Sequence, residues 1–362
     1  LEDRSLALFV ANGVTGVRDM GGHTERLLSL RGAVESGAVV GPRIRTPGAI
    51  LESPRWLQWM AEVDSAAGAS GEWRRGRIGV ADEQRAAVVV DSLRGLGVDF
   101  IKVRTVASPA VFFAIARAAR EAGLPLAGHY PFGSDPFAVA ESGLHTLEHG
   151  FYFVFFDATP QRRDSVFRRL AGGRVAVTPT SIADRWFRQT PDSVVFAILR
   201  DSTNTLLPLR RYASPVNLRD WMETMEAKKE EDPPLDGQEM RRGLLRDLRE
   251  LRAAGVTILA GTDAPIVLTF PGYSLHDELV YLVREMGLSP AEALRTATST
   301  AAASLGIADA GEIRAGNDAD LVILSANPLQ DIAAIRRVEA VVLRGRLFDR
   351  SRLDALLRQA EF

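Results

Sequence analysis

The chain has 362 residues, of which 46% are hydrophobic and 25% are charged, as in an ordinary folded protein with one large domain or two smaller ones. Its formal net charge of −2 argues against a general binder of phosphate backbones, which needs concentrated basic charge. The absence of cysteine excludes disulfides, iron–sulfur clusters, thiolate zinc sites and a cysteine nucleophile. No run of about 18 apolar residues is present, so no membrane-spanning helix is expected.

Short apolar runs typical of buried strands alternate with amphipathic stretches along most of the chain. The strand-like runs cover residues 13–20, 42–51, 98–105, 124–130, 145–150, 174–180 and 256–263. Buried strands that alternate with helices predict a parallel sheet with helical crossovers. We therefore expect an α/β fold of the TIM-type (β/α)8 barrel class over residues 1–310. Seven strands is one short of a closed barrel, and the opening residues read as the tail of a helix, so we interpret the first strand as missing from this chain.

Three stretches depart from this alternation. Residues 183–234 hold aromatic, proline and charged residues in no regular pattern, and we predict an insertion over the mouth of the barrel, where lids and specificity loops belong. Residues 66–77 are rich in glycine and arginine and predict a mobile loop. After residue 310 the pattern indicates strands joined by turns, so we expect a small β-rich module over 311–349 and a terminal helix over 350–362.

Four side chains with metal-binding or acid–base chemistry lie on different predicted strands. His129, His149 and Asp263 stand where their strands end, and Lys102 alternates with apolar neighbours inside its strand. In an α/β barrel the carboxyl ends of the strands form one rim, where active-site residues collect. Two imidazoles and a carboxylate suit a divalent metal such as zinc, with an open position for water.

Each of these residues also has a structural explanation when it is taken alone. A histidine at a strand end can be a hydrogen-bonded core residue, Asp263 can cap the following turn, and Lys102 can pair with a carboxylate. The joint pattern favours a site, because all four residues follow barrel order. Lysine is also rare, with three lysines against 41 arginines, so Lys102 inside an apolar strand needs its own explanation.

Several strings in the chain resemble those of a known family. They are NGVTGVRDMGG (12–22), DFIKVR (99–104), AGHYP (127–131), TLEHG (146–150), AGTDAP (260–265) and GEIRAGNDADLVIL (311–324). Together they resemble the amidohydrolase superfamily, and more narrowly its imidazolonepropionase-like and Xaa-Pro dipeptidase-like branch. The resemblance covers essentially the whole chain except the insertion around 183–234.

The resemblance implies a metal site with defined roles. His129 and His149 would be ligands of the second metal, and Asp263 would be a ligand of the first metal and the catalytic base. Lys102 would bridge two metals as a carbamate, a modification that requires a primary amine. The implied cofactor is one or two divalent ions, with zinc the expected metal. The family's His-x-His motif on the first strand is absent from this sequence, and we interpret this departure as a truncation upstream of Leu1.

Other residues receive lesser expectations. Tyr130 and Arg104 are predicted to contact substrate, and His276 is expected to support the site from behind the ligands or to pack in the core. A structural role is expected for His145 and a loop role for His23. The aromatic run at 151–156 is interpreted as core packing or as a hydrophobic wall for substrate.

The expected reaction is hydrolysis of an amide-type C–N bond in a dipeptide, an N-acyl amino acid or a cyclic amide, with Asp263 moving the proton. One alternative keeps the fold but uses one metal, as in deaminase-like members, with Lys102 merely structural. Another is a truncated or inactive barrel that binds a ligand without turnover. We expect a small-molecule substrate, no nucleic acid and no membrane. The compartment stays open, as does the oligomeric state, a homo-oligomer included.

Overall fold

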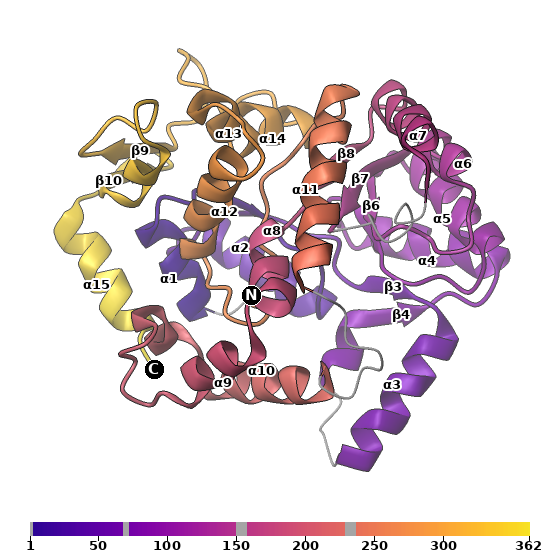
Figure 1. Cartoon of the computed structure of the whole chain (residues 1–362), viewed down its shortest axis with the longest axis horizontal. Coiled ribbons are helices and arrows are strands. Elements are labelled where there is room, and N and C mark those ends of the chain that lie inside the picture. The colour runs from indigo at the N-terminus through magenta and orange to yellow at the C-terminus, as the bar shows by residue number, and fades with distance from the viewer. Residues whose placement is uncertain (1–2, 68–71, 150–157, 229–236) are drawn as a thin grey trace.

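The computed structural model describes residues 3–67, 72–149, 158–228 and 237–362. In these ranges the main sheet has six parallel strands in the order β4-β3-β5-β6-β7-β8 (Figure 1). They are β3 (Ile50–Glu52), β4 (Arg77–Gly79), β5 (Ile101–Val103), β6 (Leu126–Gly128), β7 (Leu144–Glu148) and β8 (Ala176–Thr178). A parallel pair, β1 (Gly16–Arg18) and β2 (Arg43–Arg45), precedes β3 along the chain. Ile258 extends the order beyond β8 through a single parallel bridge to Val177.

Helices cross over between these strands and cover the sheet. They are α2 (Thr24–Glu35), α3 (Pro54–Ala67), α4 (Glu83–Gly95), α5 (Pro109–Glu121), α6 (Pro136–Glu141) and α7 (Pro160–Gly172). Three of them start in the same way: Ser108, Asp135 and Thr159 cap the helix with a side-chain oxygen, and proline follows at once. This combination satisfies a free amide and presets the first helical φ angle. Buried apolar side chains of α4, α5 and α7 pack with the strands in the main core.

The region predicted as an irregular insertion is helical in the residues that the structure describes. Its elements are α8 (Ser181–Asp184), a π-helical turn η3 (Arg185–Gln189), α9 (Asp192–Arg200), η4 (Pro208–Tyr212) and α10 (Pro215–Lys228). Buried side chains of α9 and α10 form a second hydrophobic cluster with Val267, Leu268 and Phe270. The insertion therefore packs on the segment that follows Asp263.

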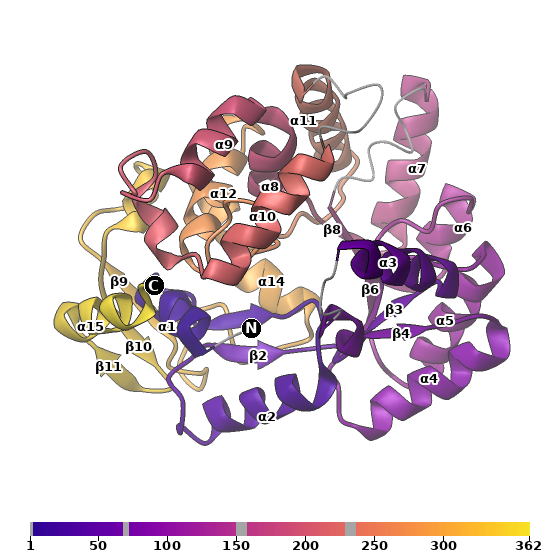
Figure 2. The ribbon, with the colours of Figure 1, turned by 90° about the horizontal axis from the view of Figure 1, so that it is seen from below.

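The rest of the chain returns to the barrel and then forms a separate sheet. Helices α11 (Gly237–Ala253), α12 (Tyr273–Arg284), α13 (Pro290–Thr296) and α14 (Ser299–Ser304) come first. The antiparallel sheet has the order β11-β10-β9, from β9 (Leu321–Leu324), β10 (Val338–Leu343) and β11 (Arg346–Phe348), with η5 (Ile332–Arg336) between the first two. The terminal helix α15 (Arg350–Ala360) packs beside α1 (Asp3–Ala11), at the end of the molecule opposite α4 and α5 (Figures 1 and 2).

The predicted fold class is confirmed: the chain alternates strands and helices in an α/β barrel and carries a small antiparallel sheet at its C-terminal end. Two local predictions were wrong. Part of the stretch expected to be a mobile loop forms η1 (Glu72–Gly76) and β4, and residues 256–263 form no named strand. Among the described residues, no helix combines the length and apolar character needed to cross a bilayer.

Candidate functional site

The parallel strands bring the four predicted residues to one region of the barrel. Lys102 lies inside β5, His129 directly follows β6, and His149 directly follows β7. The rings of His129 and His149 are perpendicular, with their centroids 4.7 Å apart. His149 Nδ1 lies 3.8 Å from Asp263 Oδ2, and Lys102 lies within the electrostatic influence of Asp263. The predicted convergence of these side chains is therefore present in the structure.

The backbone at two of these positions is in the left-handed region. His149 and Asp263 have φ angles of 65° and 52°, values that cost a non-glycine residue about 1–2 kcal/mol. At His149 the surroundings fix this geometry, because its amide donates to the Thr178 carbonyl at 2.8 Å and its Nδ1 hydrogen-bonds Thr180 Oγ1 at 2.9 Å. In the tautomer in which Nδ1 donates to Thr180, Nε2 is the ring nitrogen whose lone pair is free for a ligand.

The Lys102 amine is buried and has no hydrogen-bond partner in the ranges that the structure describes. The residue is 2% exposed, and its Nζ contacts no donor or acceptor at hydrogen-bond distance among the described residues. Burial lowers the pKa of Lys102 to about 8, although the charges of Glu148 and Asp263 oppose that shift. An amine in this state is neutral far more often than an exposed lysine, and a neutral amine is a nucleophile.

A buried ion pair lies beside Lys102 and was missed by the sequence analysis. Arg18, the last residue of β1, donates to Glu148 Oε1 at 2.8 Å and to Thr146 Oγ1 at 2.7 Å. Burial alone would raise the pKa of Glu148, but the charges of Arg18 and Lys102 and a hydrogen bond from Thr146 hold it below its usual value. Glu148 is thus an ionised carboxylate whose nearest cation is Arg18. The sequence offered one signal for this pair: each of the two residues is a charged side chain inside a predicted strand, Arg18 in the run 13–20 and Glu148 in the run 145–150.

Both site histidines are held in the neutral form. Burial lowers the pKa of His129 well below its usual range, and the positive charge of Lys102 acts in the same direction. Burial also lowers the pKa of His149, against the opposing charge of Asp263. Neutral imidazoles carry the free lone pair that metal coordination requires.

The two residues predicted to contact substrate have partners within the protein. The Tyr130 hydroxyl donates to the Ser134 carbonyl at 2.6 Å, and burial raises the pKa of this phenol to about 12. Arg104 donates to Glu52 Oε1 at 3.1 Å and stacks on the Trp56 ring at 4.0 Å. The Arg104 charge also helps to lower the pKa of His129, so this guanidinium lies within electrostatic range of the site.

The remaining histidines lie in structural contacts. His276 is buried, and its Nε2 hydrogen-bonds the Asn12 carbonyl at 2.9 Å, which joins α12 to the end of α1. His145 contacts the Ser304 carbonyl at the end of α14. His23 caps α2 by accepting from the Arg26 amide at 3.5 Å. The aromatic run at 151–156, interpreted as core or substrate wall, lies outside the described residues.

The imidazole nitrogens and carboxylate oxygens of the candidate site are donor types that bind a divalent cation, and a complete ligand set would also require a modified Lys102. Among the described residues, no group of three or more histidine, aspartate or glutamate side chains is arranged to hold a metal ion. The buried Lys102 amine, which has no hydrogen-bond partner among these residues, is nevertheless within electrostatic range of Asp263 and His129. A carbamate on this amine would add carboxylate-type oxygens, so the residues fit a metal when Lys102 is modified.

Comparison with curated proteins gives short matches to hydrolases. The ochratoxinase of Aspergillus niger is 40% identical over 90 residues, which is 24% of this chain and 18% of that protein. The imidazolonepropionase of Salinispora tropica is 40% identical over 84 residues, or 22% of this chain and 20% of that protein. The matched segments therefore span about a fifth of these relatives' own length.

Similarity to solved structures extends over nearly the whole chain. The structure of "AH, Bottromycin amidohydrolase" has a TM-score of 0.75 and 25% identity, covering 99% of this chain and 76% of that one. A Xaa-Pro dipeptidase with bound methionine in its active site has a TM-score of 0.67 and 22% identity, covering 96% and 78%. Because the identity to the dipeptidase is 22%, this second similarity supports the fold alone.

A family model accounts for the barrel and the C-terminal sheet together. The amidohydrolase family model matches residues 4–348, a range that contains Lys102, His129, His149 and Asp263. The resemblance read from the sequence motifs is thereby confirmed. The chain belongs to the amidohydrolase family.

Proposed function

We propose that the protein is a metal-dependent hydrolase of an amide-type C–N bond in a dipeptide, an N-acyl amino acid or a cyclic amide. The observation that carries this proposal is the convergence of two neutral histidines and a carboxylate with a buried lysine amine that has no hydrogen-bond partner in the described part of the chain. The names of the relatives, ochratoxinase, bottromycin amidohydrolase and Xaa-Pro dipeptidase, support the same reaction class.

His129, His149, Asp263 and a carbamate on Lys102 would hold one or two divalent ions, with zinc the expected metal. The carbamate forms when the neutral Lys102 amine adds to carbon dioxide and loses a proton, so burial of this amine favours its formation. When bound, a divalent cation would polarise the substrate carbonyl and make water more acidic. The chain supplies no thiolate, so its own donors are nitrogen and oxygen atoms.

Asp263 is the residue that moves the proton in this proposal. Its carboxylate accepts a proton from the attacking water and returns it to the nitrogen of the leaving amine, so the C–N bond breaks as the amine becomes neutral. His149 supports this role by position, since its Nδ1 lies 3.8 Å from Asp263 Oδ2. Arg104 and Tyr130 remain proposed substrate contacts, with Arg104 suited to a carboxylate because of its planar guanidinium.

The experiment measures metal content and hydrolysis in the same preparations. Purified protein is dialysed with zinc, with and without bicarbonate, and then assayed on a panel of dipeptides, N-acyl amino acids and cyclic amides. We expect bound zinc that increases with bicarbonate, and hydrolysis of at least one substrate class. Lys102→Arg keeps the positive charge but cannot form the carbamate, and should lose at least about 100-fold in kcat/KM, or about 2.7 kcal/mol of transition-state stabilisation.

A matched control is available in the second of the three lysines. Lys228 on α10 bonds Asp192 at 2.6 Å, so Lys228→Arg preserves an ion pair that includes none of the four site residues and should leave kcat/KM unchanged. One equivalent of metal with no dependence on Lys102 would favour the deaminase-like alternative. Metal binding without turnover of any panel member would favour a barrel that only binds ligands.

A further inference from the structure

The segment after Asp263 is held by the insertion. We call residues 263–266 the Asp263 turn, which is closed by a hydrogen bond from the Ile266 amide to the Asp263 carbonyl at 3.0 Å. Asp263 itself is exposed. The following residues Val267, Leu268 and Phe270 are buried in the hydrophobic cluster formed with α9 and α10. The position of the turn is therefore tied to helices outside the family-like motifs.

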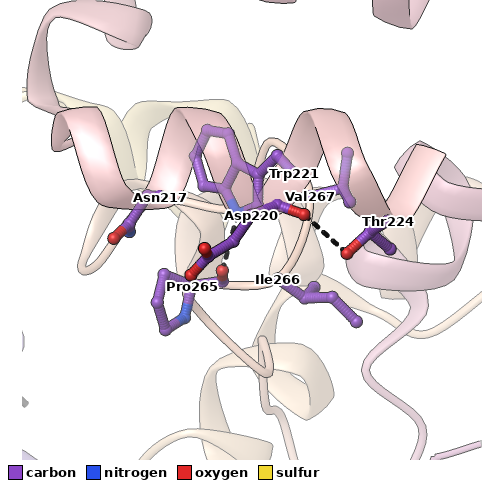
Figure 3. Close-up of a pocket in the computed structure, with 7 residues that line it drawn as sticks. All are labelled: Asn217, Asp220, Trp221, Thr224, Pro265, Ile266 and Val267. Carbon is purple, nitrogen blue, oxygen red and sulfur yellow. Dashed lines mark hydrogen bonds between the residues drawn. The ribbon is translucent and has the colours of Figure 1, made fainter. Parts of the chain in front are cut away.

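Trp221 on α10 makes a directed contact with this turn. The residue is 3% exposed, and its indole Nε1 donates to the Pro265 carbonyl at 2.8 Å (Figure 3). The ring also packs edge-on against Phe270, with centroids 5.6 Å apart. A buried indole usually finds one acceptor, and here the acceptor is a backbone carbonyl two residues from Asp263.

A small pocket lies beside this hydrogen bond. It has a volume of about 170 Å³ and is bordered by α10 and by the segment that follows Asp263. It is lined by Asn217, Asp220, Trp221, Thr224, Pro265, Ile266 and Val267 (Figure 3). The indole hydrogen bond is therefore a directed polar contact between α10 and the turn, in addition to the hydrophobic contacts of Val267, Leu268 and Phe270.

We propose that Trp221 is a positioning residue that holds the Asp263 turn through the Pro265 carbonyl, and thereby sets where the Asp263 carboxylate lies relative to His149. The catalytic part of this inference rests on the proposed function, in which Asp263 binds metal and moves the proton. The mechanical part concerns the turn alone. A residue in the insertion thus supports a site built on the barrel strands.

The test removes the donor and keeps an aromatic ring. Trp221→Phe should increase hydrogen–deuterium exchange in the peptide that covers 262–268, because the Ile266 amide loses protection when the turn loosens. It should also weaken zinc binding and lower kcat by about 10-fold with little change in KM, within the 10–100-fold range typical for residues that orient ligands. The control is Trp59→Phe, the same substitution at a side chain that is 55% exposed on α3.

A second variant distinguishes the effect of the Trp221–Pro265 hydrogen bond from the effect of hydrophobic packing. Phe270→Leu keeps the indole donor and removes the ring contact, so it should lower the melting temperature while the 262–268 peptide stays protected. Unchanged exchange in Trp221→Phe would overturn the proposal whether or not the protein hydrolyses an amide. Equal exchange in Trp221→Phe and Phe270→Leu would overturn it as well. Faster exchange in Trp221→Phe alone would support the proposal that the Trp221 hydrogen bond holds the turn. If the protein also binds no zinc, that result would contradict the proposed function and leave this proposal standing.

Discussion

The properties of each buried charged side chain in the candidate site depend on whether it has a hydrogen-bonded partner. Lys102 and Glu148 are both buried, but Arg18 bonds the Glu148 carboxylate and Lys102 Nζ has no hydrogen-bond partner within the described part of the chain. A buried ion pair whose hydrogen bonds are satisfied tolerates its desolvation, whereas a buried charge without its partner does not. The Arg18–Glu148 pair should therefore contribute to stability in a way that surface pairs do not.

The first prediction concerns this pair. Arg18→Met leaves Glu148 buried without its cation, and should lower the free energy of unfolding by about 3–5 kcal/mol. Arg18→Met combined with Glu148→Gln should recover part of that loss, because no unpaired charge remains. The measurement is equilibrium urea denaturation at pH 7.

The control for this prediction is an exposed pair. Arg94 bonds Asp91 at 2.8 Å, and both side chains are more than half exposed. Arg94→Met should cost less than about 1 kcal/mol, as exposed pairs do. A similar cost for Arg18→Met and Arg94→Met would contradict the assignment of Arg18 as the buried counter-ion.

At this scale the sequence identified the ligand candidates but missed their partners. Lys102 was noticeable because the chain has three lysines, while Arg18 is one of 41 arginines. The Arg18–Glu148 contact joins residues 130 positions apart, which no local pattern encodes. The hydrogen bond from Trp221 to the Pro265 carbonyl likewise joins residues far apart in the sequence. Only the three-dimensional fold brings such pairs together.

At the scale of elements, strands that lie within long apolar runs of the sequence were predicted, whereas β4, which lies in no such run, was not. β5, β6 and β8 fall inside the expected runs, and β7 begins at Leu144, one residue before the run expected over 145–150. β4 has three residues, Arg77-Ile78-Gly79, and is formed by pairing with β3, so its own sequence gave little signal. Residues 256–263 are apolar enough for a strand, yet only Ile258 bridges to β8, because pairing depends on the neighbouring strand and not on composition.

The insertion shows a second way in which an element depends on a distant residue. The start of α8 is capped by Glu278 of α12, which accepts from the Ser181 and Ile182 amides at 3.1 and 2.8 Å. Burial raises the pKa of Glu278 to about 7, although these two amides oppose the shift. The cap therefore makes the folding stability depend on pH.

The second prediction follows from the sign of this shift. Glu278 has a higher pKa in the folded protein than its unfolded value of about 4.3, so its contribution is full below that value and is lost as the pH rises towards 7. Glu278→Gln cannot ionise and should remove this loss, which is about 4 kcal/mol at 1.36 kcal/mol per pKa unit. The measurement is the free energy of unfolding between pH 4.5 and 7.5.

The exposed Glu121 at the end of α5 provides the matched substitution for this test. Glu121→Gln should leave the pH dependence of unfolding as it is in the unsubstituted protein. If Glu278→Gln also leaves that dependence unchanged, the Glu278 carboxyl group does not ionise differently in the folded and unfolded states.

At the scale of the whole molecule, the C-terminal sheet and the first helix share one core. Val10 of α1 packs with Val341 of β10 and Leu353 of α15 in a buried cluster. Arg43 of β2 bonds Asp320 at 2.7 Å, which adds a polar link between the barrel and the sheet. The sequence pattern predicts the module itself, but no local pattern indicates that the terminal helix packs against α1.

The last prediction tests whether this shared core stabilises the whole molecule. Leu353 is completely buried, so Leu353→Ala should lower the free energy of unfolding by about 2–5 kcal/mol. Leu347→Ala, at a side chain that is 52% exposed on β11, should change it by less than about 0.5 kcal/mol. Because Leu353 packs with α1 as well as β10, the loss should affect the global transition in urea, and hydrogen exchange in α1 should rise with it. If exchange in α1 stays at its original rate while α15 alone opens, the terminal helix is an independent element and does not stabilise the barrel.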